Sequence, residues 1–164
     1  MGIVKLGPDL FNGGDSYSGY QPNGNFTGFS MLHESGTGGA PKYGVVSQLP
    51  VLGDVSNPLA DHTRTRGGPD VSEVGYYKSF LDSNITVELA ATAKAGLYNY
   101  TFPGSDPRNV IVDVSHVLPS YRGMGLEQHY LGGSMAVEQN GAQTRYQGYG
   151  SYDNVGSISS TIIN

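Results

Sequence analysis

The sequence lacks cysteine and tryptophan altogether. Without cysteine, the chain has no disulfide framework, no thiolate metal site and no cysteine nucleophile. Long hydrophobic runs are missing too, since no segment reaches the ~18 apolar residues that a membrane-spanning helix needs. Residues 1–5 carry neither the basic region nor the apolar stretch of an export signal. These absences predict no membrane partner and no signal peptide in this chain.

Charged residues are scarce, at 14% of the chain, and the net charge of −5 is acidic. This balance provides no electrostatic surface for nucleic acid or for an anionic membrane, so neither partner is expected. What the sequence has instead is glycine, at 25 of 164 residues, and twelve tyrosines. Leu, Ile, Val and Phe together only just exceed the floor of about 20% below which chains tend to stay disordered. We therefore predict one folded domain with long irregular loops.

Apolar residues alternate with a period of two, and no segment keeps the spacing of an amphipathic helix. The alternation predicts strands over residues 84–91 and 96–102, with a turn at 92–95 between them. In residues 110–115 three valines alternate with Ile111, Asp113 and Ser115. Because Ile111 is apolar as well, the segment is predicted to form a central strand that is buried on much of both faces. The fold class predicted from these short strands and long loops is all-β, specifically a β-sandwich.

A β-hairpin is predicted near the C-terminus, because residues 133–139 and 142–149 flank Asn140-Gly141. This pair accepts positive φ at both turn positions and favours a two-residue type I′ turn. Three stretches rich in glycine, proline and polar residues are predicted to be loops: residues 7–41, 53–73 and 101–108.

Short chemical motifs exclude several enzyme classes. The four histidines show no spacing that brings two imidazoles to one metal ion, so no metal site is predicted. Nucleophile-elbow and phosphate-binding loop motifs are absent, and Gly36-Thr37-Gly38-Gly39 lacks the helix that a dinucleotide site needs. His33 beside Glu34 is the most suggestive pair for binding a hydroxyl-rich ligand, although a structural histidine and a solvated glutamate explain it equally well.

N-glycosylation acceptor triplets begin at Asn25, Asn84 and Asn99. Attached glycans require passage through the secretory pathway. Three triplets only slightly exceed the number expected by chance in this composition. They weakly favour an exported parent protein.

Residues 28–44 (GFSMLHESGTGGAPKYG) resemble the N-terminal domain of glycoside hydrolase family 92, the calcium-dependent exo-acting α-mannosidases. Further segments match the family in order: residues 2–9 (GIVKLGPD), 18–20 (SGY), 75–77 (GYY), 87–92 (VELAAT) and 100–103 (YTFP). The resemblance covers about residues 2–150. It predicts an N-terminal sandwich domain at residues 1–150 and a divergent tail at 151–164.

The resemblance implies an incomplete β-sandwich of the galactose-mutarotase type, which packs against a helical barrel that follows it. In such inverting enzymes the catalytic acids and the calcium ligands belong to that barrel, which is absent from this chain. The chain is therefore expected to hold no cofactor and to be inactive alone, as a fragment shortened at both ends. The parent is expected to be extracellular and to act on α-mannosides or mannose-rich glycans.

The resemblance also implies which loops wall the mannose subsite. The matched positions, taken as substrate-lining residues and not as catalysts, are Ser18, Gly19, Tyr20, His33, Glu34, Ser35, Gly36 and Thr37.

Two other functions fit the sequence. One is a stand-alone, non-catalytic β-sandwich that binds carbohydrate through its tyrosines and its Gly-Thr-Gly loop. The other is a mutarotase-like epimerase, which needs a catalytic His and Glu pair such as His33 and Glu34.

Overall fold

The computed structural model describes residues 4–11, 13, 20–33, 44–118, 128–154 and 157–163. In these residues the chain contains strands and turns and no helix, which confirms the all-β prediction. No helix long and apolar enough to cross a membrane occurs within them.

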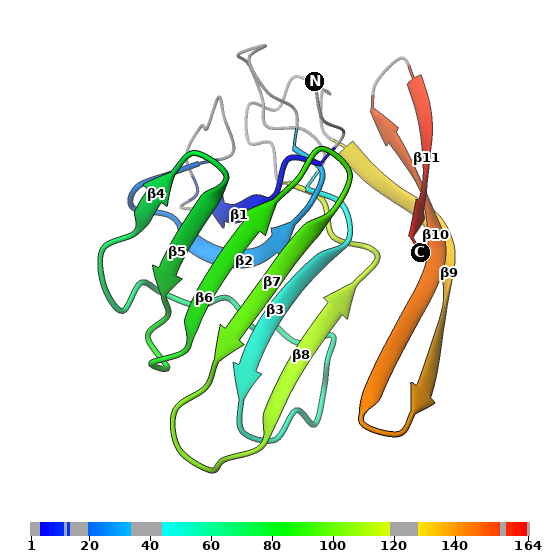
Figure 1. The fold of residues 1–164 in the computed structure, drawn as a ribbon. Helices are drawn as coiled ribbons and strands as arrows, with labels where there is room; N and C mark the ends of the chain where they lie inside the picture. The colour runs from blue at the N-terminus through cyan, green and yellow to red at the C-terminus, as the bar shows by residue number, and fades with distance from the viewer. Residues whose placement is uncertain are drawn as a thin grey trace.

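In the part of the chain that the structure describes, eleven strands form three antiparallel sheets (Figure 1). The first sheet has the order β1-β2-β3-β8, with β1 at Gly7–Phe11, β2 at Asn25–Ser30, β3 at Ser47–Leu52 and β8 at Arg108–Asp113. The second has the order β4-β5-β6-β7, with β4 at Val71–Glu73, β5 at Tyr76–Phe80, β6 at Thr86–Ala91 and β7 at Gly96–Thr101. The third has the order β11-β10-β9, with β9 at Gln128–Asn140, β10 at Gln143–Asn154 and β11 at Ser157–Ile163.

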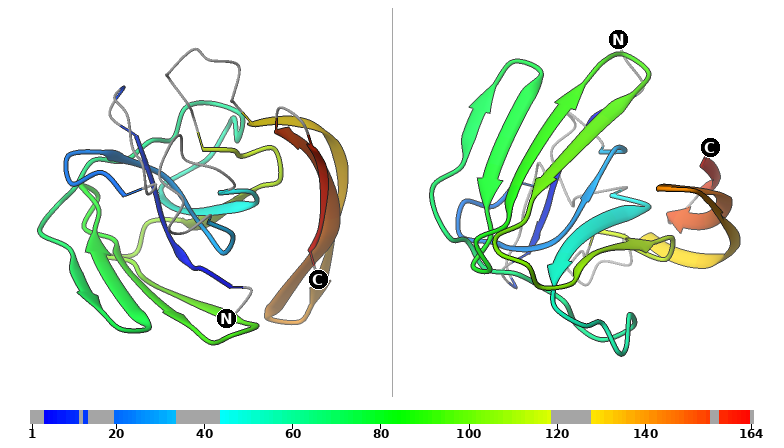
Figure 2. Two further views of the ribbon diagram at one scale, coloured as in Figure 1. Left: turned by 90° about the horizontal axis from the view of Figure 1, so that it is seen from above. Right: turned by 60° about the horizontal axis from the view of Figure 1, so that its bottom comes forward.

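The two four-stranded sheets form the sandwich, and the third sheet stands beside them (Figure 2). One apolar cluster joins residues of both four-stranded sheets: Leu10, Phe26, Phe29, Leu49 and Val51 with Leu81, Ile85, Val87 and Leu89. The strand predicted over residues 84–91 is confirmed as β6, and Ile85, Val87 and Leu89, which alternate along this segment, are all buried. The turn at 92–95 is also confirmed, since Thr92 and Ala95 hydrogen-bond to each other.

The predicted hairpin is present, but its turn lies one residue further along the chain. Asn140 pairs with Gln143, so the two loop residues are Gly141 and Ala142. Gly141 has φ of 60° and Ala142 is not among the residues with positive φ. A positive φ at only the first loop position is the pattern of a type II′ turn, not of the predicted type I′.

Two other expectations are corrected by the sheet order. The segment 7–41, predicted to be a loop, contains β1 and β2, whose polar and glycine residues hide the alternation. The strand predicted to be central is β8, which lies at the end of its sheet with β3 as its partner among the described strands. Val110 is consequently 43% exposed. Segment 101–108 does connect two strands, as predicted.

β1 is buried on both of its faces near its middle. Asp9 and Leu10 are 0% and 2% exposed, and successive side chains of a strand point to opposite faces. Leu10 joins the apolar core, so Asp9 enters the other side. The register of β1 against β2 shifts between these two residues, where Asp9 pairs with Gly28 and Leu10 with Phe26. Asp9 is thus a carboxylate placed inside the protein by the strand itself.

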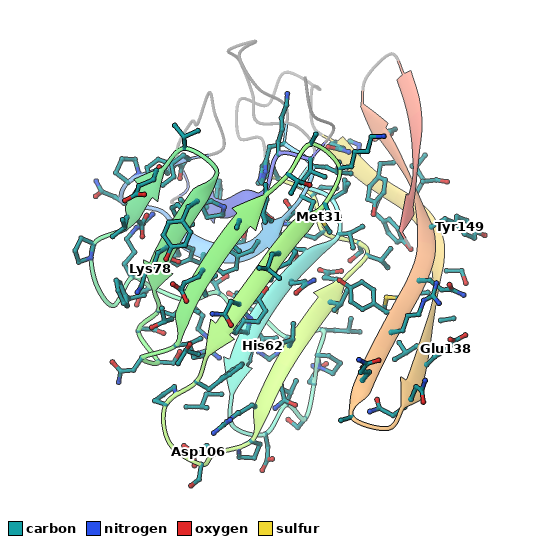
Figure 3. The ribbon with its side chains drawn as sticks, viewed as in Figure 1. Met31, His62, Lys78, Asp106, Glu138 and Tyr149 are labelled. Carbon is teal, nitrogen blue, oxygen red and sulfur yellow. The ribbon has the colours of Figure 1, made fainter. Side chains whose placement is uncertain are left out.

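The long β9-β10 hairpin is attached to the sandwich by tyrosine side chains. Tyr152 is fully buried and donates its hydroxyl hydrogen bond to the carbonyl of Val114, just after β8. Tyr146 accepts a hydrogen bond of 2.6 Å from Gln48 of β3. β10 also pairs with β11, which lies within the segment 151–164. The outer part of the hairpin is largely exposed, and Figure 3 shows Glu138 and Tyr149 there.

Candidate functional site

A buried polar cluster joins three distant segments of the chain. It consists of Asp9 in β1, Ser30 at the end of β2, His33 just after β2, and His116 after β8; we call it the Asp9 cluster. His33 Nε2 lies 2.6 Å from Asp9 Oδ1, and Ser30 Oγ donates to the same oxygen at 2.9 Å. His116 Nε2 lies 3.1 Å from Asp9 Oδ2, within ion-pair distance but not aligned as a hydrogen bond.

Asp9 and His33 each shift the pKa of the other in the direction that favours its charged form. Burial alone raises the pKa of Asp9, but the contacts with His116 and His33 outweigh it and hold the pKa below its ordinary value of 3.8. Burial lowers the pKa of His33, but Asp9 and the Lys5 carbonyl raise it above 6.5 overall. The pair is therefore favoured in its ionised form.

Tyr20 belongs to a second cluster, centred on Asp70. Tyr20 and Tyr77 donate their hydroxyl hydrogen bonds to Asp70 Oδ2, at 2.8 and 2.7 Å, and Arg66 pairs with the same oxygen. The Arg66 guanidinium also lies 5.6 Å from the centre of the Tyr20 ring and 4.8 Å from that of Phe26. Burial and the Asp70 hydrogen bond raise the pKa of Tyr20, so its hydroxyl stays protonated and donating.

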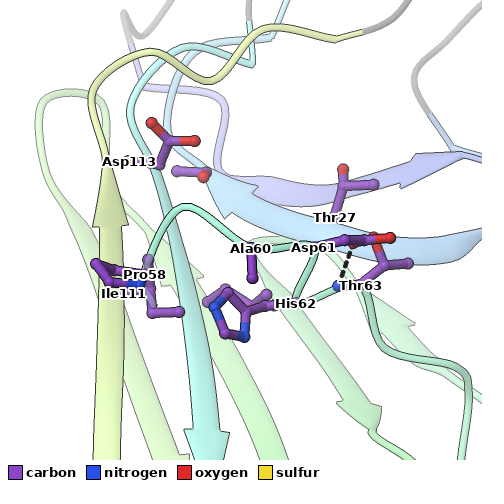
Figure 4. A pocket seen from close by; sticks show the side chains of 10 residues that line it. Thr27, Pro58, Ala60, Asp61, His62, Thr63, Ile111 and Asp113 are labelled. Atoms are coloured by element: carbon purple, nitrogen blue, oxygen red, sulfur yellow. Dashed lines mark hydrogen bonds between the residues drawn. The ribbon is translucent and has the colours of Figure 1, made fainter. Parts of the chain in front are cut away.

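An open pocket of about 190 Å³ lies where the segment 58–63 passes over β2, β3 and β8 (Figure 4). Polar side chains from Thr27, Asp61, His62 and Asp113 line it together with apolar ones. Asp61 accepts a hydrogen bond from the backbone of Thr63 at 2.9 Å. No substrate-lining residue predicted from the sequence borders this pocket among those that the structure describes.

A second pocket, of about 220 Å³, lies between the start of β1 and strands β4 to β6. Gly7 and Pro8 line one side, and Tyr76, Tyr77 and Leu89 line the other. Tyr77 therefore borders this pocket while its hydroxyl contributes to the Asp70 cluster. Tyr77 is thus common to the lining of this pocket and to the Asp70 cluster.

Two of the eight predicted substrate-lining residues fall within the described part of the chain. Tyr20 is 43% exposed and belongs to the Asp70 cluster, whereas the His33 side chain is only 12% exposed and belongs to the Asp9 cluster. The other six lie outside the described residues: Ser18, Gly19, Glu34, Ser35, Gly36 and Thr37.

Sequence reasoning gave no role to the buried acids and to the second histidine. Asp9 lies among apolar residues in the segment 6–11. An acid in an apolar segment is the one feature of the sequence that could have indicated a buried, paired carboxylate. Nothing in the sequence near His116 or Asp70 links either residue to its partners, because those partners are distant in the chain.

The three asparagines predicted as glycan acceptors are all exposed. Asn25 begins β2, and Asn84 has a positive φ of 59° in the turn before β6. Asn99 on β7 donates to Glu88 at 2.9 Å. Exposure leaves each one reachable, and glycan occupancy stays a prediction.

Comparison with known proteins identifies the family. The glycosyl hydrolase family 92 N-terminal domain matches residues 1–162, nearly the whole chain. This chain belongs to that family. The match extends beyond residue 150, where the sequence resemblance ended, and includes most of β11.

Two relatives place the family 92 domain in larger proteins. An uncharacterized secreted glycosidase of Arthroderma benhamiae (strain ATCC MYA-4681 / CBS 112371) is 27% identical over 172 aligned positions, 92% of this chain and 21% of the relative. The structure of the family 92 glycosyl hydrolase ccman5 superimposes with a TM-score of 0.80 at 18% identity, covering 97% of this chain and 22% of that one. The chain spans about a fifth of each relative, and the likeness to ccman5 confirms the β-sandwich fold.

Proposed function

We propose that this family 92 domain forms part of the wall of a sugar-binding site in an exported glycosidase that acts on α-mannosides. Family membership supports the glycosidase class, and the secreted relative supports export. The observation that carries the proposed sugar contact is Tyr20, an exposed aromatic side chain held in one orientation.

Tyr20 has the properties of a rigid stacking surface. Its hydroxyl is fixed by Asp70, and the Arg66 guanidinium lies near its ring. Nearly half of the residue remains exposed to solvent. An aromatic side chain already held in place loses little conformational entropy when it binds a ligand, and its apolar face suits the apolar face of a pyranose ring.

The proposed role of this chain is binding, not bond cleavage. Family resemblance assigns the catalytic acids and a calcium ion to a helical domain of the parent enzyme. In the described residues no group of three or more His, Asp or Glu is arranged to hold a metal ion. The epimerase alternative gains no support, because both ring nitrogens of His33 already contact protein atoms.

The test is a titration of the 164-residue chain with methyl α-mannoside, followed by NMR signals of the tyrosine rings. We expect saturable shifts at Tyr20, and Tyr20→Ala should weaken binding at least tenfold, about 1.4 kcal/mol. Tyr149→Ala is the matched control, because Tyr149 is 54% exposed on the β9-β10 hairpin, on the opposite side of the molecule from β4, the strand that directly follows Asp70 (Figures 1 and 3).

Each result is decisive for the proposal. Saturable binding that Tyr20→Ala removes and Tyr149→Ala keeps supports a sugar-contacting wall. Binding that survives Tyr20→Ala, or no shift of the Tyr20 ring at saturating sugar, contradicts it.

A further inference from the structure

Both ring nitrogens of His33 face oxygen atoms of the protein. Nδ1 lies 2.7 Å from the backbone carbonyl of Lys5, and Nε2 lies 2.6 Å from Asp9 Oδ1. A carbonyl oxygen can only accept, so the contact with Lys5 requires a proton on Nδ1. The proton on Nε2 then decides whether the ring is neutral or an imidazolium.

The surroundings of Asp9 place that proton on Nε2. Asp9 Oδ1 accepts from Ser30 Oγ at 2.9 Å as well as contacting His33, and Oδ2 faces His116. An ionised carboxylate accepts both hydrogen bonds at Oδ1 and attracts His116 at Oδ2, whereas a carboxylic acid gives up acceptor capacity to its own proton. Asp9 is 0% exposed, and a buried carboxylate needs a positive partner. His33 supplies it through a short, charge-assisted hydrogen bond to Oδ1, and His116 lies beside the other carboxylate oxygen.

We infer that Asp9 and His33 form a buried ion pair that positions the chain at His33, with His116 as a second arm, and that the His33 ring is not a sugar ligand. The three residues tie β1, the end of β2 and the segment after β8 to one point. The next residue along the chain, Glu34, begins the stretch 34–37 that the family resemblance implies to be substrate-lining. Asp9, His33 and His116 are thus positioning residues, and their link to sugar binding rests on the proposed function.

Gly28 explains how this pair is accommodated. Gly28 is the register partner of Asp9, and a Cβ atom there would lie 3.5 Å from Asp9 Oδ2 and 2.6 Å from Ser47 Cβ. A larger residue at position 28 would therefore collide with β3 beside the carboxylate. The absence of a side chain at position 28 lets Ser47 of β3 and the Asp9 carboxylate both approach the backbone of β2 closely.

The groups that face the Asp9–His33 pair come from several elements of the fold. His116 faces Asp9 from the segment after β8, and the backbone of Lys5 faces His33 from the residues before β1. Across the sandwich, Tyr98 of β7 has its pKa raised chiefly by burial, with smaller contributions from the charges of Tyr146 and Asp9. A phenol is neutral below about pH 10, so Tyr98 adds no charge beside Asp9 near pH 7, and the ionisable groups in contact with Asp9 are His33 and His116.

The test is a long-range ¹H–¹⁵N NMR spectrum of the histidine rings in the uniformly labelled 164-residue chain, recorded from acid to alkaline pH. We expect both His33 ring nitrogens to be protonated at pH 7. In Asp9→Asn the loss of this protonation should move to lower pH, because the negative partner is gone. Asp153→Asn is the matched control: it alters the exposed His129–Asp153 pair, 2.8 Å apart, and should leave the His33 titration unchanged.

Methyl α-mannoside is then added to the labelled wild-type chain. The His33 ring should remain doubly protonated at saturating sugar, while the amide of Glu34 shifts. A neutral His33 ring at pH 7 overturns the ion pair, even if Asp9→Asn does not fold. If either ring nitrogen of His33 loses its proton when the sugar is added, the positioning role is overturned. If sugar fails to bind, the proposed function fails, and the protonation result still decides the ion pair.

Discussion

Two of the aspartate–histidine pairs in the described part of the chain have similar distances but different surroundings. His33 and Asp9 are 2.6 Å apart, with side chains 12% and 0% exposed. His129 and Asp153 are 2.8 Å apart on the β9-β10 hairpin, with side chains 59% and 38% exposed. Distance therefore does not distinguish the pairs, whereas access of water does. Solvent screens the outer pair, whereas the Asp9 carboxylate is shielded from water and is neutralised by its contacts with His33 and His116.

The largest effect is expected from breaking the inner pair. Asp9→Asn should lower the free energy of unfolding by about 3–5 kcal/mol, because it leaves His33 buried without its counterion. Urea unfolding at pH 6, followed by circular dichroism, measures the loss. The double variant Asp9→Asn with His33→Asn should lose less than the sum of the single variants, since both charges are removed. A loss under 1 kcal/mol for Asp9→Asn would rule out a stabilising role for the pair.

The next effect tests how tightly the inner pair is enclosed. Gly28→Ala places a Cβ atom 2.6 Å from Ser47 Cβ and should cost about 1–3 kcal/mol of stability through overpacking. Gly68→Ala is the control, because the nearest atom to its Cβ would be Phe80 Cδ2 at an ordinary 3.5 Å. Adding Ser47→Gly should restore part of the loss at position 28. Equal melting temperatures for Gly28→Ala and Gly68→Ala would contradict the close approach.

A smaller effect is expected from pH. The raised pKa of His33 gives stability that is complete below its ordinary value of 6.5 and is lost as pH rises through the folded value. The lowered pKa of Asp9 gives stability that is complete above 3.8 and is lost as pH falls through the folded value. The difference in unfolding free energy between wild type and Asp9→Asn should therefore be greatest between these two pH values. A difference that does not change with pH would exclude the charge as its source.

The smallest effect is expected from the outer pair. Asp153→Asn should change the free energy of unfolding by no more than about 1 kcal/mol, because exposed ion pairs contribute little. The same urea experiment, repeated in high salt, should leave the variant and wild type closer still. A loss comparable with that of Asp9→Asn would show that burial does not separate the two pairs.

The parts of the fold that the sequence revealed are those whose information is local. Residues 84–91 alternate because one face of β6 meets the core, and the hairpin is marked by Asn140-Gly141. The turn lies one residue later than predicted because, among residues 140–142, only Gly141 has the positive φ that the turn requires. β2 was missed because Asn25, Thr27 and Gly28 obscure its alternation.

The candidate site was less predictable, because its contacts depend on topology. Family resemblance singled out Tyr20 and His33, and the structure places both among specific partners. The partners themselves, Asp9, Asp70 and His116, carry no local signal of what they face. A central position was predicted for β8 from its apolar character, yet sheet order is fixed by packing of the whole chain.

The contact between Asp9 and His116 also concerns how the protein is made. His116 follows Asp9 by about 100 residues, so at ribosomal rates of about 5–20 residues per second it is synthesised on the order of 5–20 s later. His33 emerges much sooner, and with it the first counterion for Asp9. The nascent chain can thus pair β1 with β2 early, with the Asp9 charge already balanced by His33. The contact between His116 and Asp9 forms later, once the segment after β8 has been synthesised.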